Sequence, residues 1–329
     1  MRLNIYVRKT VLIFIIFIIG VYELPAYQDS TVPDLPLSTK DRQVKNLRYV
    51  VNKDLQQNLE KQLKQNKLWA SLISKQKMSV GIVDLSDQEN IKFARVNGDV
   101  MMYAASLPKL AILLAACQAF EDGTLKETPN ILNDLKIMIS ISDNQAATRM
   151  IDRLGFKKIE SVLKDSRYRL YDPLWGGGLW VGKRYAQSGN RYPDPLMGLS
   201  HGATVTQVCR FYYMLAMGKL VSRERSKQML DIMIDPGLHH KFVNTLDYIA
   251  RDAKVYRKSG TWKNWHADSA LVWGTQWRRY IIVALVEDPS GEKICRDLVL
   301  TIENVLKSQP RKQEKKLTVR AKQTEPYIY

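Results

Sequence analysis

Three short stretches of the sequence carry hydroxyl, ammonium and amide side chains in patterns that suit nucleophilic catalysis. The first, Ser106-Leu107-Pro108-Lys109, enters an apolar run that predicts a helix over 107–121. A spacing of three residues puts Ser106 and Lys109 on one helix face, with Cβ atoms about 5–6 Å apart. Where burial and nearby cations lower the pKa of the lysine, its neutral amine can take the proton of the serine hydroxyl. Taken alone, the same pattern also fits a serine that caps a helix.

The second stretch, Ser142-Asp143-Asn144, lies between helices predicted over 131–141 and 144–154. A second hydroxyl at this point can pass a proton to a leaving nitrogen, and the amide of Asn144 can bind the lysine or a substrate. An ordinary helix-capping cluster has the same composition.

The third stretch, Lys258-Ser259-Gly260, comes at the end of a strand predicted over 253–258. A cation, a hydroxyl and a residue without a side chain along a strand edge can pair with an extended substrate and hold its carboxylate. By itself this triplet is also consistent with an ordinary loop that contains a glycine. It indicates a functional site only in combination with the other two stretches.

Hydrophobic periodicity predicts the elements that must position these residues. It indicates an α+β fold, in which strands from both chain ends form one antiparallel sheet and a helical region is inserted between them. The predicted strands are 78–85, 91–96, 253–258, 267–273 and 280–287. The predicted helices are 47–75, 107–121, 131–141, 144–154, 157–164, 204–217, 222–234 and 296–307. The Gly- and Pro-rich stretch over 165–203 is expected to be a long loop of the functional or disordered kind.

In this order and in these contexts, the three stretches resemble those of class A β-lactamases and low-molecular-weight penicillin-binding proteins. The resemblance covers about residues 78–307 and implies a β-lactamase/transpeptidase-like fold with an acyl-enzyme intermediate. The resemblance implies that Ser106 is the nucleophile, that Lys109 activates it, that Ser142 is a second catalytic hydroxyl and that Lys258 is a catalytic cation. It also implies substrate contacts for Asn144, Ser259 and Gly260. The oxyanion hole would consist of the backbone N–H groups of Ser106 and Thr261.

One departure from the family pattern concerns the loop after the second stretch. Class A enzymes carry a glutamate there, with an asparagine four residues on, to activate the water that releases the acyl group. No glutamate occurs between Glu160 and Glu224. Asp172 is a candidate substitute for deacylation, but it is shorter by one methylene and precedes Pro173, where a turn role competes. Efficient β-lactam hydrolysis is therefore not expected.

Charge and the N-terminal pattern bear on where the protein works. The 50 Lys and Arg against 33 Asp and Glu give a net charge of +17, but no basic stripe with interleaved aromatic residues occurs, so nucleic acid is not an expected partner. Basic residues precede an apolar run over 11–22, which is typical of a secretory signal. We expect an exported, periplasmic or extracytoplasmic protein, with membrane attachment if the N-terminal segment is retained. Its expected parts are a signal peptide or signal anchor over 1–26, a tether over 27–45, a hydrolase domain over 46–307 and a basic disordered tail over 308–329.

Neither the three cysteines nor the four histidines show metal-ligand spacing, so no metal and no cofactor is expected. We expect a monomer. Three functions stay open: an acyl-serine hydrolase with D,D-peptidase-like action on an amide or peptide substrate of the cell envelope, a β-lactamase that deacylates through Asp172, and a silent domain whose groove binds a cell-wall peptide or a protein partner. The three intact stretches favour an enzyme.

Overall fold

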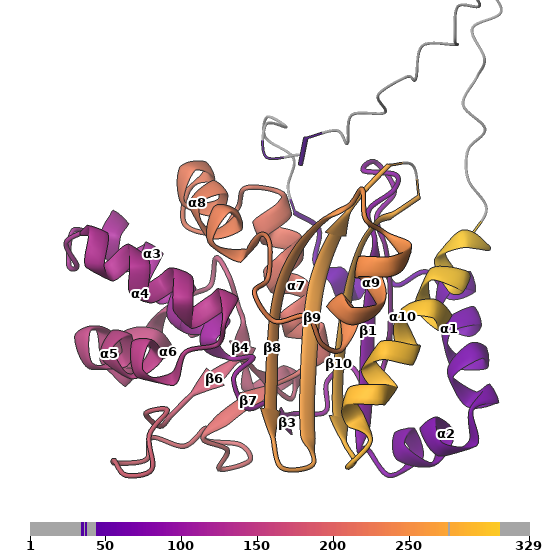
Figure 1. Ribbon diagram of the computed structural model, residues 1–329, viewed down its shortest axis with the longest axis horizontal. Coiled ribbons are helices and arrows are strands. Elements are labelled where there is room, and N and C mark those ends of the chain that lie inside the picture. Colours follow the sequence, from indigo (N-terminus) through magenta and orange to yellow (C-terminus); the bar gives the residue numbers. More distant parts are fainter. Residues whose placement is uncertain (1–33, 36, 38–43, 276, 310–329) are drawn as a thin grey trace, which may run out of the picture. The chain divides into compact units, whose positions relative to one another are not determined.

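A five-stranded antiparallel sheet in the order β2-β1-β10-β9-β8 organises the molecule (Figure 1). The computed structural model describes residues 34, 35, 37, 44–275 and 277–309. The strands are β1 (Met78–Asp84), β2 (Lys92–Val96), β8 (Lys254–Trp262), β9 (Trp265–Trp273) and β10 (Arg279–Glu287). Because β1 pairs directly with β10, early and late parts of the chain meet in the middle of the sheet. The predicted α+β fold, with one antiparallel sheet built from both chain ends and helices inserted between them, is confirmed.

Alternate residues of the central strands pack against opposite faces of the sheet. On β10, Ile281, Val283 and Leu285 belong to one hydrophobic cluster, whereas Ile282 and Ala284 belong to the other. All five side chains are fully buried. Successive side chains of a strand point to opposite faces, so a strand that is apolar on both faces must be covered by helices on both sides.

Four helices cover one of these faces (Figure 1). They are α1 (Lys53–Gln65), α2 (Lys67–Ser74), α9 (Phe242–Ile249) and α10 (Gly291–Lys307). In α1, Leu55, Leu59 and Leu63 recur every four residues and are fully buried, because that spacing lines up one helix face. The side chain of Asn52 accepts a hydrogen bond from the backbone N–H of Leu55 at 2.9 Å and caps the helix.

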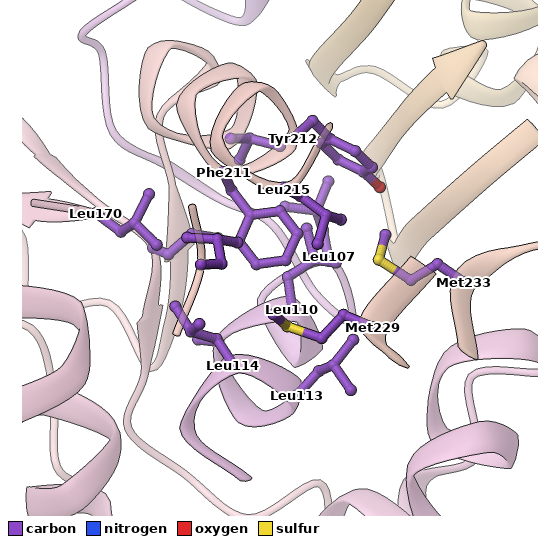
Figure 2. Packing of buried hydrophobic residues seen from close by; sticks show 14 of the residues in the cluster. Leu107, Leu110, Leu113, Leu114, Leu170, Phe211, Tyr212, Leu215, Met229 and Met233 are labelled. Atoms are coloured by element: carbon purple, nitrogen blue, oxygen red, sulfur yellow. The ribbon is translucent and has the colours of Figure 1, made fainter. Parts of the chain in front are cut away.

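The inserted helices pack in the hydrophobic cluster of the opposite face. They are α3 (Lys109–Glu121), α4 (Pro129–Ser140), α5 (Asn144–Leu154), α6 (Phe156–Lys164), α7 (Val205–Ala216) and α8 (Arg223–Met233). From Lys109 to Phe120 every residue of α3 is buried. Figure 2 shows leucines of this helix packed against Phe211 of α7 and Met229 of α8. A helix that is apolar on all sides belongs in a core. The packing of α3 in the core therefore fixes the position of the turn that precedes it.

Short strands order much of the stretch that the sequence predicts to be one long loop. They are β4 (Tyr171–Asp172), β5 (Gly177–Gly178), β6 (Trp180–Val181) and β7 (His201–Ala203), with the 3₁₀ helix η3 (Pro173–Trp175) after β4. β7 lies between β6 and β3 (Met102–Tyr103). This small sheet brings residues near position 201 beside the chain that leads to Ser106.

Several element boundaries differ from those predicted. The helix expected over 47–75 is a 3₁₀ helix, η2 (Leu47–Tyr49), followed by α1 and α2, because the side chain of Asn66 starts a new helix by capping Trp69 N. The strand expected to end at Lys258 continues to Trp262, so Lys258-Ser259-Gly260 lies inside β8 rather than at its end. Helix α9 was missed, because eight residues give too little periodicity to recognise.

The predicted signal segment over 1–26 lies outside the described residues, as do most of the tether and of the C-terminal tail. In the part of the chain that the structure covers, no helix is both long enough and apolar enough to cross a membrane.

A buried ion pair next to the third stretch gives a test of the fold. Arg257 donates to Asp268 through Nε at 2.7 Å and through Nη2 at 3.0 Å, and both side chains are almost completely buried. Asp268→Asn leaves a buried guanidinium without a charged partner and is expected to lower the free energy of unfolding by about 3–5 kcal/mol. Urea-induced unfolding measures the loss. The control Asp231→Asn removes an exposed partner of Lys227 and should cost no more than about 1 kcal/mol; equal losses in both variants would contradict the prediction.

Candidate active site

Ser106 stands in a tight turn that leads into α3. Its carbonyl accepts a hydrogen bond from Lys109 N at 3.2 Å, so the turn continues directly into the helix. Ala105, just before it, has a φ of +50°, a conformation that L-residues adopt only when the surrounding structure holds them in it. The predicted helix start at 107 is therefore a turn, and the helix itself begins at Lys109.

The second stretch occupies the connection between α4 and α5. Ser142 has a φ of +63°, and Asp143 caps α5 by accepting a hydrogen bond from Ala146 N at 2.6 Å. Of the three residues in this stretch, Asp143 therefore has the helix-capping role that is the alternative to catalysis. The side chains of Ser142 and Asn144 remain available, and both contact Lys109.

The ammonium group of Lys109 lies at the centre of this arrangement. The side chain is fully buried, and Nζ donates to Ser142 O at 2.6 Å, to Asn144 Oδ1 at 2.8 Å and to Ser142 Oγ at 3.4 Å. Burial lowers the pKa of Lys109 to about 7, although the nearby carboxylate of Asp143 favours the charged form. A lysine with this pKa exists partly as the neutral amine at neutral pH, as a general base requires.

Lys258 reaches the same hydroxyl from the sheet. It is buried in the middle of β8, and its Nζ donates to Ser142 Oγ at 2.9 Å and to Ser259 O at 2.7 Å. Burial lowers the pKa of Lys258 well below its usual value, and the positive charge of Lys109 lowers it further. Two lysines 149 positions apart in the chain thus meet at one serine hydroxyl, which can exchange a proton with either.

Gly260 lets β8 touch the turn that holds the nucleophile. A Cβ atom at this position would lie 2.3 Å from Ala104 O, 2.7 Å from Ser106 N and 2.8 Å from Leu107 N. No side chain fits in that space, so only glycine allows the strand to pack on the turn. Ser106 and Thr261, whose backbone N–H groups form the predicted oxyanion hole, both line the cleft beside this contact.

The cleft has a volume of about 890 Å³. Its lining comprises Tyr103, Ala105, Ser106, Asn144, Lys183, Arg184, Tyr185, Ala186, Gln187, Ser200, His201, Thr261, Trp262 and Trp265. Among these described residues none is Asp or Glu, whereas Lys183 and Arg184 are cationic. The lining does not include Ser259 or Gly260, so a direct contact of these two residues with substrate stays a prediction.

Asp172 lies outside the lining of the cleft around Ser106, and its role in deacylation stays a prediction. It ends β4, and its Oδ1 accepts a hydrogen bond from Leu174 N at 3.0 Å, which starts η3. The carboxylate of Asp172 therefore stabilises the turn at Pro173, which is the alternative role that the sequence indicates. Asp172 lines a separate small cavity beside Arg48 and is not part of the lining of the cleft around Ser106.

Sequence reasoning missed two aromatic residues of the cleft. The ring of Tyr185 lies 4.4 Å from Lys109 Nζ, and its hydroxyl donates to Ala105 O at 3.2 Å. The ring of His201 lies 4.3 Å from that of Tyr185, and burial lowers the pKa of His201 to about 4, which keeps it neutral at neutral pH. Both come from the Gly- and Pro-rich stretch, where no periodic pattern signals their position.

Sequence reasoning also missed Lys241, which lies behind the strand of the predicted oxyanion hole. The side chain is fully buried, and Nζ donates to Gly260 O at 2.5 Å, to Thr261 Oγ1 at 2.8 Å and to Ala267 O at 3.1 Å. One ammonium group therefore connects Gly260 and Thr261 of β8 with Ala267 of β9. A fully buried lysine is rare unless it is paired, but its type and position in the sequence gave no sign of this contact.

Comparison with known proteins identifies solved structures with a similar fold. The chain has no match among curated proteins. Solved structures similar to it include a β-lactamase from Sphaerobacter thermophilus, with 16% identity and a TM-score of 0.58 over 76% of this chain and 95% of that one. A mutant of PBP-A, in an acyl-enzyme complex with penicillin-G, is 21% identical, with a TM-score of 0.57 over 77% of this chain and 97% of that one. The TLA-3 extended-spectrum β-lactamase is 14% identical, with a TM-score of 0.59 over 77% of this chain and 98% of that one.

These likenesses establish the fold, which is the β-lactamase/transpeptidase-like one that the sequence predicts. The family model described as the beta-lactamase enzyme family matches residues 58–133 and 127–306. The two matches together span the sheet, the inserted helices and all three stretches of candidate catalytic residues. The chain therefore belongs to the beta-lactamase enzyme family.

Proposed function

We propose that the protein is an exported serine hydrolase that forms an acyl-enzyme through Ser106 on an amide, peptide or β-lactam-like substrate of the cell envelope, in the manner of a D,D-peptidase. The observation that carries the proposal is the convergence at Ser142. Its hydroxyl lies within hydrogen-bonding distance of both Lys109 and Lys258, while Asn144 lines the cleft together with Ser106 and Thr261. Such convergence suits proton transfer between a nucleophile and a leaving group.

In the proposed reaction, Ser106 Oγ attacks the substrate carbonyl carbon while the neutral amine of Lys109 accepts the hydroxyl proton. The negative charge that develops on the carbonyl oxygen is stabilised by the backbone N–H groups of Ser106 and Thr261. Ser142 then delivers a proton to the nitrogen as the C–N bond breaks, and the ammonium of Lys258 or Lys109 replaces that proton. The amine leaves, and Ser106 carries the acyl group as an ester.

The lining of the cleft favours slow release of this ester. Water attacks an ester efficiently when a base removes its proton, and a carboxylate is the usual base beside a serine ester in this family. The described lining residues include no carboxylate, and the ring of Tyr185 covers one side of the Lys109 ammonium. We therefore infer an acyl-enzyme that persists, as expected of a penicillin-binding protein rather than of an efficient β-lactamase.

The proposed cell-envelope location rests on the N-terminal sequence, in which basic residues precede an apolar run that is typical of an export signal. The same segment would attach the protein to the membrane if it were retained. Arg184 at the cleft is already paired with Asp152 at 2.6 Å, whereas the cationic side chain of Lys183 suits substrates that carry carboxylates, as cell-wall peptides do.

Intact-mass spectrometry tests the proposal. After incubation with benzylpenicillin, the protein is expected to gain the mass of one penicillin molecule and to keep most of it for many minutes after free penicillin is removed. In parallel, nitrocefin should be hydrolysed only to the extent of about one equivalent in the first minutes. No adduct with any β-lactam would contradict acyl-enzyme formation. A transient adduct with rapid nitrocefin turnover would instead identify an efficient β-lactamase.

A further inference from the structure

A second, much smaller cavity lies away from the cleft, and nothing in the proposed reaction uses it. It is formed by η2, the first turns of α7 and the segment from β4 to η3, and its volume is about 20 Å³. That space holds one particle of about the size of a water molecule.

The walls of this cavity contain buried polar atoms without partners. Arg48 Nε, Thr206 Oγ1 and Gln207 Oε1 line or adjoin it, and none of the three has a hydrogen-bond partner within the described part of the chain. Thr206 and Gln207 are 1% and 3% exposed. A fourth such atom, Arg95 Nη1, belongs to a side chain that shares the carboxylate of Asp99 with Arg48. Buried polar groups in native proteins almost always have partners, so this grouping indicates a polar occupant.

The charge around the cavity indicates the sign of that occupant. Arg48, Arg169 and Arg210 line it, against the single carboxylate of Asp172. Asp99 pairs with Arg48 at 2.7 Å and lies 3.6 Å from Arg95, which leaves four guanidinium groups for two carboxylates. Burial lowers the pKa of Arg210, and the positive charges of Arg169 and Arg48 lower it further.

We propose that this cavity binds one monovalent anion of halide size, held by Arg48, Arg210 and the hydroxyl of Thr206. An anion would partner the unpaired donors and offset the surplus of positive charge, whereas a water molecule would do only the first. Gln207 takes part if its carboxamide turns by 180°, which exchanges Oε1 for the Nε2 donor.

The site connects three segments that are distant in sequence. Arg48 belongs to η2, Thr206 and Arg210 belong to α7, and Asp172 ends β4. The chain continues from β4 through β5 and β6 to Tyr185, which contacts Lys109. The bound anion therefore stabilises the folded state and fixes the segment that leads to this wall of the cleft.

Thermal unfolding of the full-length protein tests the proposal. Sodium chloride or bromide is titrated against sodium gluconate at constant ionic strength. Binding to the folded state alone raises Tm in a saturable way, so Tm is expected to rise with either halide and not with gluconate. Arg210→Gln and Thr206→Val should each weaken the apparent halide affinity about tenfold or more, because each removes a hydrogen bond to a charged ligand. Lys227→Gln, at an exposed position of α8, is the control with the same charge change as Arg210→Gln and should respond like the wild type.

Crystals grown in bromide give the second measurement, in which an anomalous peak in the cavity supports the proposal. Density without anomalous signal would identify water and overturn it. A Tm rise that is equal in halide and gluconate would also overturn it, as would a halide response that survives in Thr206→Val. If Arg210→Gln fails to fold, the halide response of Thr206→Val tests the proposal, because valine keeps the size and shape of the threonine side chain.

Discussion

Replacing Ser106 with alanine is expected to abolish covalent labelling by β-lactams, with a fall of at least about a thousandfold in the acylation rate. The reason is chemical, since alanine has no atom that can attack a carbonyl carbon. Labelling by a fluorescent penicillin, followed by intact-mass spectrometry, measures the result. The exposed serine variant Ser161→Ala, on α6, is the matched control and should label at the wild-type rate.

The fold should tolerate Ser106→Ala. Within the described residues the side chain of Ser106 makes no hydrogen bond, and the turn is held through its backbone carbonyl. The Tm of the variant should therefore stay within a few degrees of the wild-type value. A variant that folds and still forms the adduct would show that the nucleophile is another residue, and the proposed mechanism would fail.

Replacing Lys109 with methionine is expected to slow acylation by about 10²–10⁴-fold, the usual contribution of a general base. Methionine fills a similar volume but cannot accept a proton, and it removes the hydrogen bonds to Ser142 and Asn144. Stopped-flow measurement of acylation with a chromogenic β-lactam gives the rate. Lys136→Met, at an exposed position of α4, is the control and should acylate normally. A Lys109→Met variant that acylates as fast as the control would exclude Lys109 as the base.

The pH dependence of acylation reports the protonation of Lys109. Its folded-state pKa is lowered to about 7, so the ammonium form dominates below that pH and the neutral amine above it. The acylation rate is expected to rise about tenfold per pH unit below pH 7 and to level off above it, as required of a single base that must be neutral. Lys109→Arg keeps the positive charge but cannot deprotonate in this range, and it should lose the rise. A flat wild-type profile between pH 5 and 9 would contradict the assignment.

Three buried lysines connect these expectations: Lys109 and Lys258 contact Ser142, and Lys241 contacts Thr261. Lys109, Lys258 and Lys241 are all fully buried, and burial lowers the pKa of each. Burial disfavours the charged form of each lysine, and an anionic group of a substrate that comes close to them would stabilise that form. We therefore expect a preference for substrates with a carboxylate near the scissile amide. The burial that makes the lysines suitable for proton transfer is also the reason for this preference.

Local sequence patterns were enough to predict the helices and strands that have a clear hydrophobic pattern. The apolar run after Lys109 and the continuous apolar strand at 280–287 have periods set by the geometry of a single element, and the structure contains both. The three candidate stretches are equally local, because a motif of three or four residues has the same internal spacing wherever the chain takes it. Their order along the chain was therefore sufficient to indicate the family.

Element ends and short elements were less predictable. The strand over 253–258 extends to Trp262 because nine consecutive residue pairs with β9 support it, and pairing with a distant strand leaves no mark on local periodicity. Helix α9 has only eight residues, and its stability comes from packing against its neighbours rather than from helix propensity.

Sequence alone determined which side chains can do chemistry here and in what order they occur, whereas tertiary structure decided which of them meet. Lys109 and Lys258 contact Ser142 from 33 and 116 residues away, Tyr185 and Lys241 join the site without any motif, and Asp172 lies in another cavity. The physical reason is that a helix turn or strand fixes distances over only a few residues. Burial, pKa shifts and contacts between distant segments depend on how the sheet and the inserted helices pack together.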